Sequence, residues 1–285
     1  MPQSSSPAEQ VDYNSFARDV HSQCGEDGII EAILERLPER DMWAVEFGAW
    51  DGVTLSNTAA LEEVGYTRIL IEGDRSRFDK LRSRFAPHPV SQPIHAVVGW
   101  QHPHTLDDIL ATTSTPRDFD VLSIDIDGND YHVWRATTSY RPKLVVIEFN
   151  PTIRNGVEFV QKPDLHARRS CSISSLVNLG KTKGYELAAS TEYNAIFVRS
   201  DLFGHLGLVD NSVDVIRTDT SWQSEIFFGF DGHAIITGGR GLEWHGVDLK
   251  DDVRVVPRVF DGFPGDFGIA RRGMLRLWQR YRRTR

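Results

Sequence analysis

The feature that most constrains this chain is a short apolar segment that ends in an acid and runs into a glycine-containing turn. Residues 43–47 read Trp-Ala-Val-Glu-Phe, and Gly48 and Gly52 follow. The apolar run predicts a buried strand, and a helix is expected over residues 56–64. Glycine takes positive φ readily and has no Cβ, so such a turn can approach a ligand closely. The segment therefore predicts the ligand-binding edge of an open α/β sheet.

The acids around this turn indicate which ligand it suits. A dinucleotide-binding turn reads Gly-x-Gly-x-x-Gly and directs a helix N-terminus at a pyrophosphate. Here Glu46 and Asp51 accompany the glycines, and two carboxylates would repel a pyrophosphate. They suit a cationic or neutral ligand, such as the amino-acid end and the ribose of S-adenosylmethionine. A buried strand followed by an ordinary turn is the simpler alternative.

A second apolar segment, residues 67–71, also ends in an acid, Glu72. A carboxylate at the end of the second strand of a nucleotide-binding sheet can accept hydrogen bonds from ribose hydroxyls. Asp74 is better placed to cap the helix expected over residues 75–85. Two consecutive strands that end in acids favour a nucleoside ligand more strongly than either strand alone.

Further apolar segments alternate with predicted helices. Three more buried strands are expected, at residues 94–100, 119–130 and 142–151. Near-continuous apolar strands separated by helices indicate a parallel sheet that is buried on both faces. Residues 185–189 and 194–199 then predict a hairpin, which would add one antiparallel strand.

The ends of the fourth and fifth predicted strands carry a dense group of polar side chains. Asp125 and Asp127 end the fourth strand, and Glu148 and Asn150 end the fifth. Neighbouring parallel strands end at the same sheet edge, so these side chains are expected to face one another. Four oxygen donors suit Mg²⁺ or Mn²⁺, which could lower the pKa of a substrate hydroxyl. Alternatively, one acid contacts the amino group of a cofactor and the others cap turns.

A general base is expected close to these acids. His132 follows them directly and can accept a proton near neutral pH. Other histidines of the chain are rivals, and a single histidine is more often structural than catalytic. The predicted catalytic residues are Asp125, Asp127 and His132.

Composition and charge exclude several classes of protein. The net charge of −8 argues against a nucleic-acid-binding protein held by its overall field. No apolar run is long enough to span a bilayer, and residues 1–10 lack the apolar core of a signal peptide. Two cysteines, Cys24 and Cys171, cannot make a disulfide framework or a zinc site by themselves. We therefore expect a cytoplasmic protein.

Periodicity fades after residue 202, and the chain is expected to end in an appendage and a helix. Short strands are predicted at residues 227–228, 234–236 and 253–256 within an irregular stretch. The helix expected over residues 270–285 has an apolar side and many arginines. Such a helix can bind an anionic membrane surface or an acidic partner. It can equally pack on the body of the protein with its arginines in solvent.

Five motifs, taken in order, resemble the class I S-adenosylmethionine-dependent methyltransferases and, within them, the FkbM-like family. They are Ser22-Gln23-x-Gly25-Glu26-Asp27, Glu46-Phe47-Gly48-Ala49-x-Asp51-Gly52, Ile71-Glu72, Thr105-Leu106-Asp107 and Ile124-Asp125-Ile126-Asp127-Gly128. Residues 127–131 are also similar to the Asp-Gly-Asp-x-Tyr motif of metal-dependent macrolide-sugar O-methyltransferases. Residues 148–150 depart from the Asp-Asp or Asp-Asn pair of those enzymes, which leaves the metal-ligand set open.

The resemblance implies an α/β, Rossmann-like fold whose mostly parallel seven-stranded sheet has an antiparallel last strand. It implies S-adenosylmethionine as the cofactor and methyl transfer, commonly to a hydroxyl of a sugar or natural product. The expected cofactor-binding residues are Glu46, Gly48, Ala49, Asp51, Gly52, Asn57, Glu72, Gly73, Gly99 and Asp125.

We therefore expect an O-methyltransferase that acts on a small hydroxylated acceptor, with a divalent cation as an assisting group. Two alternatives stay open. One is a methyltransferase fold with other chemistry based on the same cofactor, and the other is a non-catalytic binding module with a docking tail. A homo-oligomer is compatible with either. The expected organisation is an arm over residues 1–20, the methyltransferase-like domain over 21–202, an appendage over 203–269 and the basic helix over 270–285.

Overall fold

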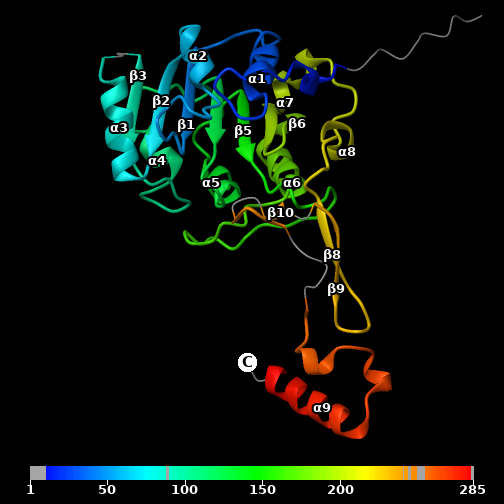
Figure 1. Ribbon diagram of the computed structural model, residues 1–285. Helices are drawn as coiled ribbons and strands as arrows, with labels where there is room; N and C mark the ends of the chain where they lie inside the picture. Colours follow the sequence, from blue (N-terminus) through cyan, green and yellow to red (C-terminus); the bar gives the residue numbers. More distant parts are fainter. Residues whose placement is uncertain (1–10, 88–89, 240, 243–244, 249–253, 284–285) are drawn as a thin grey trace, which may run out of the picture. The chain divides into compact units, whose positions relative to one another are not determined.

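The computed structural model describes residues 11–87, 90–239, 241–242, 245–248 and 254–283 (Figure 1). The chain divides into two compact units. One comprises Met1–Pro151 and Asn155–Asp219, and the other comprises Thr152–Arg154 and Thr220–Arg285. Three predicted segments lie partly outside the described residues. The undescribed parts are residues 1–10 of the arm, residue 253 of the strand predicted at 253–256, and residues 284–285 of the tail.

The larger unit is built on a seven-stranded sheet. Its strands are β1 (Trp43–Phe47), β2 (Thr67–Glu72), β3 (Ser91–His95), β4 (Val121–Ile124), β5 (Leu144–Glu148), β6 (Tyr185–Ser190) and β7 (Asn194–Arg199). Their order across the sheet is β3-β2-β1-β4-β5-β7-β6. The pairs from β3 to β5 are parallel, whereas β7 is antiparallel to both β5 and β6. The expected mostly parallel sheet with an antiparallel last strand is confirmed.

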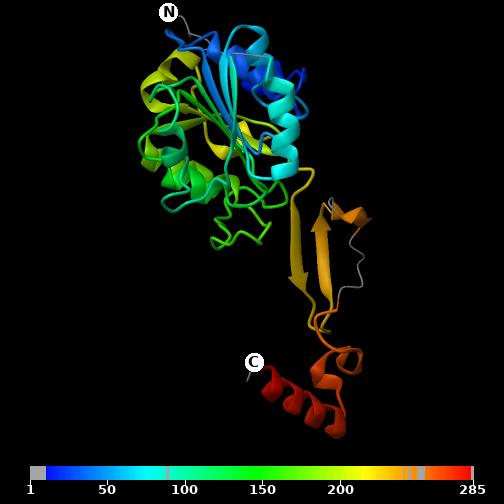
Figure 2. The ribbon, with the colours of Figure 1, turned by 90° about the vertical axis from the view of Figure 1, so that its left-hand side faces the viewer.

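Helices cover both faces of this sheet (Figure 2). Apolar residues of α1 (Glu26–Leu34), α2 (Ala59–Glu63) and α3 (Arg75–Phe85) pack against one face. Those of α4 (Leu106–Leu110), α5 (Asp130–Ala136) and α6 (Ile173–Lys183) pack against the other. Alternate residues of each buried strand therefore reach two separate cores. This arrangement leaves the carboxyl ends of β1, β2, β4 and β5 as the edge where polar side chains gather.

Local sequence determines where several of these helices begin and end. The Asp74 carboxylate accepts a hydrogen bond from the Arg77 amide at the start of α3, as its cap position predicts. Thr105 and Asp108 form a capping box at the start of α4. Gly184 ends α6 with φ +78°, a conformation that glycine adopts without steric cost.

One expectation about the larger unit is wrong. The third strand is not at residues 94–100 but at Ser91–His95, where it pairs with Arg68–Glu72 of β2. Pro93 is tolerated there because β3 is an edge strand. Within the arm expected over residues 1–20, Val11 and Tyr13 pack into the core of the larger unit. Tyr13 is buried, and its hydroxyl donates a hydrogen bond to the Leu206 carbonyl.

The smaller unit contains two short antiparallel strand pairs and the C-terminal helix. The strands β8 (Ser224–Phe228) and β9 (Ala234–Gly238) form a hairpin that includes two of the predicted strands. The strands β10 (Gly241–Leu242) and β11 (Val247–Asp248) form the other pair. The helix α9 spans Ile269–Arg283. Among the described residues, no helix has the length and apolar character needed to cross a bilayer.

Candidate functional site

The glycine turn after β1 packs tightly against the end of β4. Gly48 has φ +76°, and a Cβ there would lie 1.8 Å from the Asp125 carbonyl oxygen. Gly52 has φ +75°, and a Cβ there would lie 2.5 Å from the Phe85 ring. Both glycines are thus required by contacts within the protein. Sequence reasoning expected close approach of a ligand at this turn, whereas the structure gives a packing reason for these residues.

The Glu46 carboxylate is held by several partners inside the protein, including a buried cation. Its Oε2 accepts hydrogen bonds from the hydroxyls of Ser56 and Thr58, both at 2.6 Å. Its Oε1 accepts one from the Asn57 amide at 3.1 Å. The Arg68 guanidinium, which is 1% exposed, lies 3.3 Å from Oε2. Glu46 therefore fixes the segment that leads into α2, and this geometry does not favour it as a direct cofactor ligand.

Arg68 is the cation that holds this part of the sheet edge together. It donates hydrogen bonds to the Gly52 carbonyl at 2.8 Å and to the Thr58 hydroxyl at 3.0 Å. It also pairs with Glu62 of α2 at 2.7 Å. Because the guanidinium has five fixed donors, one buried side chain connects β2, the glycine turn and α2. No feature of the sequence selects Arg68, since an arginine within a strand more often faces solvent.

The Glu72 carboxylate, in contrast, is oriented by the backbone. Its Oε2 accepts a hydrogen bond from the Trp50 amide at 2.9 Å, and its Oε1 accepts one from the Asp74 amide at 2.7 Å. A carboxylate offers about four lone-pair positions, so two amides leave acceptor capacity on each oxygen. Glu72 thus keeps the geometry that a nucleoside with two hydroxyls requires.

The remaining predicted cofactor residues lie along the same edge with varied surroundings. The Ala49 amide donates to the Ile71 carbonyl, which joins the turn to β2. Asp51 accepts hydrogen bonds from Val53 and Thr54 and pairs with Arg84 at 3.0 Å. The Asn57 side chain donates to Ser123 of β4. Gly73 follows β2 beside Val97, and the Gly99 amide donates to the His104 carbonyl. Asp51 and Asn57 therefore have structural roles of their own.

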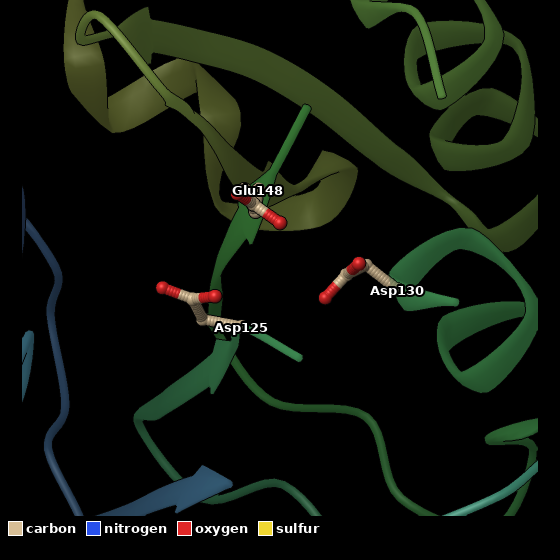
Figure 3. Close-up of side chains that lie close together, drawn as sticks. All are labelled: Asp125, Asp130 and Glu148. Carbon is tan, nitrogen blue, oxygen red and sulfur yellow. The ribbon is translucent and has the colours of Figure 1, made fainter. Parts of the chain in front are cut away.

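Three acids converge at the ends of β4 and β5 and at the start of α5. Asp125, Asp130 and Glu148 each direct a carboxylate oxygen toward the same point (Figure 3). These oxygens lie within 4.8 Å of one another. Two ligands on opposite sides of one hard cation are separated by about 4–5 Å. The separation is therefore compatible with a shared divalent cation.

The turn between β4 and α5 positions the second of these acids. Asp130 is fully buried, and its two oxygens accept hydrogen bonds from the Ile126 and Gly128 amides, both at 2.8 Å. Gly128 has φ +152°, and a Cβ there would meet the Ala167 carbonyl at 2.7 Å. Asp130 was missed as a ligand from sequence. The signal was present, because it is the third acid after this strand and it starts a helix.

Electrostatics in this cluster favour protonated acids when no cation is bound. Desolvation by the surrounding protein, together with the charges of Asp130 and Asp127, raises the pKa of Asp125 to about 7. Asp125 still reaches solvent, so the neighbouring charges are the firmer cause. Burial raises the pKa of Asp130 to about 6, although two backbone amides oppose the shift. Burial and the charges of Asp125 and Asp130 raise the pKa of Glu148 well above its usual range.

One oxygen of this cluster has no partner. Glu148 Oε2 is shielded from solvent, and no described group donates a hydrogen bond to it. A buried acceptor without a donor costs about 1–3 kcal/mol. A donor or a cation at this point would remove that cost, so the donor set fits a hard divalent ion.

Two of the predicted metal ligands do not join this group. Asp127 lies in the turn with φ +54° and reaches solvent. Asn150 uses its side-chain amide to donate to the Arg169 carbonyl at 3.1 Å. Among the described acids, cysteines and histidines, the group that could hold an ion is Asp125, Asp130 and Glu148. The predicted set of Asp125, Asp127, Glu148 and Asn150 thus shares Asp125 and Glu148 with this group, Asp130 is added, and the ligand role of Asn150 stays a prediction.

His132 lies next to these acids in sequence but not among them. It is buried in α5, and its Nε2 forms a hydrogen bond with the Gln161 carbonyl oxygen at 2.7 Å. The carbonyl can only accept, so Nε2 carries the proton. Burial lowers the pKa of His132, which keeps the ring neutral. Its ring contacts are with Trp100 and Tyr131, as expected of a packed histidine.

The polar segment before α1 is organised by its own side chains. Asp27 accepts hydrogen bonds from the amides of Val20, His21 and Ser22. Glu26 accepts hydrogen bonds from Thr191 and Asn194, which join α1 to β7. These hydrogen bonds order the segment and tie the start of α1 to the sheet.

The sequence of this chain also matches a known protein family. Residues 14–169, more than half of the chain, match the model of the methyltransferase FkbM domain. A search of curated proteins gives no match.

Similar solved structures include three methyltransferases or methyltransferase-related domains. The glycopeptide N-methyltransferase MtfA complexed with S-adenosylmethionine shares 10% identity at a TM-score of 0.37, over 64% of this chain and 88% of that one. The CcbJ methyltransferase from Streptomyces caelestis shares 13% at 0.39, over 66% and 94%. The N-terminal domain of EvdMO1 with S-adenosylhomocysteine bound shares 13% at 0.39, over 61% and 79%.

Proposed function

Because the chain belongs to the FkbM methyltransferase family, whose members use S-adenosylmethionine, we propose that it methylates a hydroxyl of a sugar or another small natural product. The observation that carries the proposal is the group of free carboxylate oxygens at one sheet edge. Glu72 offers acceptors at the end of β2, and Asp125, Asp130 and Glu148 offer acceptors at the ends of β4 and β5.

Glu72 is the proposed ligand of the cofactor ribose. Its carboxylate is held by two backbone amides, so little side-chain entropy is lost when two hydroxyls bind. Asp125 is the proposed partner of the positively charged amino-acid end, since it lies close to the end of β1 and reaches solvent. Glu46 supports this site indirectly, by holding the glycine turn through Arg68.

The proposed reaction is a direct displacement at the methyl carbon. The acceptor oxygen forms a bond to that carbon, the carbon–sulfur bond breaks, and its electron pair stays on sulfur as a neutral thioether. The hydroxyl proton must pass to a base. When no cation is bound, Asp125 suits this role better than His132, because Asp125 reaches solvent and its pKa is raised to about 7. A base with a pKa near the working pH transfers protons most effectively.

A divalent cation, Mg²⁺ or Mn²⁺, is the proposed assisting group. Asp125, Asp130 and Glu148 would hold it, and the unpartnered Glu148 oxygen is the structural reason. When bound, such an ion lowers the pKa of a coordinated hydroxyl and orients two substrate oxygens. Three carboxylates, whose charge the nearby Arg168 offsets only in part, also disfavour an anionic acceptor. A neutral polyhydroxylated acceptor fits the site better.

Calorimetry with S-adenosylhomocysteine tests the cofactor part of this proposal. We expect saturable binding to the full chain, and a loss of about 10–100-fold in affinity for Glu72→Gln. Transfer of a labelled methyl group to a panel of sugars and polyols, followed by mass analysis of the products, then tests the reaction. A product gain of one methyl on oxygen supports the proposal. Absence of cofactor binding would refute it, and a product without an added methyl would indicate other chemistry.

A further inference from the structure

The helix α9 has an extreme and one-signed charge. Its residues Ile269–Arg283 contain six arginines and no aspartate or glutamate. The whole chain, in contrast, has a net charge of −8. Four of the arginines repeat at spacings of three and four residues, which places them along one side of the helix. They are Arg272, Arg276, Arg280 and Arg283.

A second side of α9 carries apolar residues that the smaller unit leaves in solvent. Met274, Leu277 and Tyr281 follow one another at spacings of three and four residues, so they share a face. All three are exposed, Leu277 by 66%. No residue of α9 counts as buried. These side chains therefore form an apolar stripe that the described core does not use.

A different side attaches α9 to its unit. Trp278 packs on Phe260, with ring centroids 5.6 Å apart. Arg271 lies over the Phe267 ring at 3.8 Å and donates to the Val259 carbonyl. These contacts of Trp278 and Arg271 attach the helix to the rest of the smaller unit. Arg272 also donates to the Gly265 carbonyl, whereas the described contacts of this attachment do not involve Met274, Leu277, Arg276, Arg280 or Arg283.

The arginines further along the helix lack acidic partners. Within the described part of the chain, no ion pair involves Arg276, Arg280 or Arg283. A row of unpaired guanidinium groups attracts an anionic surface, and long arginine side chains can extend toward it while their stems stay on apolar ground. The chain as a whole is acidic, so such attraction would be confined to this helix.

We propose that α9 docks the protein on an anionic lipid surface. Apolar side chains would enter the boundary between headgroups and acyl chains, and the arginines would contact anionic headgroups. The apolar stripe favours lipid over other polyanions. A nucleic acid or an acidic protein would satisfy the arginines but leave Met274 and Leu277 in water. This proposal is independent of the methylation chemistry.

Vesicle flotation with the full chain tests the docking. We expect the protein to float with vesicles made of equal amounts of phosphatidylcholine and phosphatidylglycerol, and to stay in solution with phosphatidylcholine alone. Arg276→Glu with Arg280→Glu should weaken this partitioning at least about tenfold. Met274→Ser with Leu277→Ser should weaken it by a similar factor, since the buried apolar area is lost.

A control double variant distinguishes attraction by the α9 arginines from an effect of the overall net charge. Lys80→Glu with Lys181→Glu makes the same charge change at exposed positions of α3 and α6, and we expect its flotation to equal that of the wild type. Circular dichroism of each variant checks that the helix content is kept. Failure of the wild type to float would overturn the proposal. Unchanged flotation of the Met274 and Leu277 variant would overturn it too, and would indicate a purely electrostatic polyanion contact.

Discussion

Glu46 and Glu148 are both acids at the carboxyl ends of parallel strands, yet their surroundings are opposite. Glu46 accepts hydrogen bonds from three neighbours and pairs with the buried Arg68. Glu148 lies beside two other acids and has an oxygen that no described group contacts. Partners within the protein satisfy the Glu46 carboxylate, whereas one oxygen of Glu148 would be satisfied only by a bound ligand. An acid at a strand end is thus a ligand candidate only when its own partners leave oxygens free.

The difference also separates stability from binding. The Glu46–Arg68 pair should stabilise the unloaded protein, because breaking it would leave a charge buried without compensation. The acids around Glu148 should destabilise the unloaded protein, because like charges are held close together. For each substitution around Glu46 or Glu148, we therefore expect a change in the free energy of unfolding of stated sign and size.

The largest expected effect is at Arg68. Arg68→Met removes five hydrogen-bond donors from a side chain that is 1% exposed and leaves Glu46 uncompensated. We expect the free energy of unfolding to fall by about 3–5 kcal/mol, as measured by urea denaturation.

A double variant sharpens this result. Glu46→Gln with Arg68→Met removes both charges, so its destabilisation should be smaller than the sum of the two single effects. Additive effects would show that the pair is not coupled, and the structural role assigned to Glu46 would then be wrong.

The next effect is on cofactor affinity. Glu72→Gln replaces an anionic acceptor by a neutral amide, and hydrogen bonds to charged groups contribute about 1.5–3 kcal/mol. Titration calorimetry with S-adenosylhomocysteine should show the corresponding loss of about 10–100-fold. Glu62→Gln, which changes an acid on α2 that pairs with Arg68, is the control and should leave the affinity nearly unchanged. Equal losses in both variants would point to a general disturbance of the sheet edge.

A smaller effect, of opposite sign, is expected at Glu148. Two like charges 4 Å apart repel by about 4 kcal/mol at an effective dielectric constant of 20. Glu148→Gln removes an acid whose ionisation the neighbouring acids and burial oppose in the folded state, so the unloaded variant should be more stable than the wild type near neutral pH by about 1–3 kcal/mol. Thermal unfolding without added metal measures this gain. A loss of stability would mean that the Glu148 carboxylate is satisfied in the folded protein.

The same charges predict how stability depends on pH. The pKa values of Asp125, Asp130 and Glu148 are raised in the folded protein, so the folded state binds protons more tightly than the unfolded state. Their contribution to stability is then present below the unfolded pKa of about 4 and is lost as pH rises through about 7. The unloaded wild type should lose stability over this window, and Glu148→Gln should lose less. Glu35→Gln, at an exposed position, should follow the wild type.

The smallest effects on cation binding are expected at Asp127 and Asn150. Both were predicted as ligands from the sequence, but neither is one of the three converging acids. Asp127→Asn and Asn150→Ala should change divalent-cation affinity by less than about threefold, because Asp127 lies outside the converging acids and the Asn150 side chain donates to the Arg169 carbonyl. Competition with a metal-sensitive dye measures this. A loss of about tenfold or more in either variant would return that residue to the ligand set.

The sequence was sufficient to predict most of the fold for a physical reason. Buried parallel strands need continuous apolar runs, and residues 67–72 and 144–148 are such runs. Edge strands carry a weaker signal. β3 was placed a few residues too late, because Pro93 interrupts it and the apolar residues after His95 belong to a loop. Caps such as Asp74 and Thr105 were predictable because they act on neighbours in the sequence.

The site could be predicted only to the level of the sheet edge. Strand ends bring acids together, but the direction of each carboxylate depends on turn geometry and on distant partners. Arg68 contacts Glu46 because the fold pairs β2 with β1, and the sequence does not show that contact. Asp127 and Asp130 are neighbours on a turn, and the positive φ at Asp127 decides which of them faces Asp125.

The most direct test of the central contrast is Mn²⁺ binding followed by electron paramagnetic resonance, in which free Mn²⁺ gives the signal and bound Mn²⁺ does not. We predict that the wild type removes one equivalent of free Mn²⁺ and that Glu46→Gln, if folded, does the same. Glu148→Gln should bind at least about tenfold more weakly. Wild-type protein that leaves the free Mn²⁺ signal unchanged, or equal binding by Glu148→Gln, would contradict the assignment of the acids at β4 and β5 as a cation site.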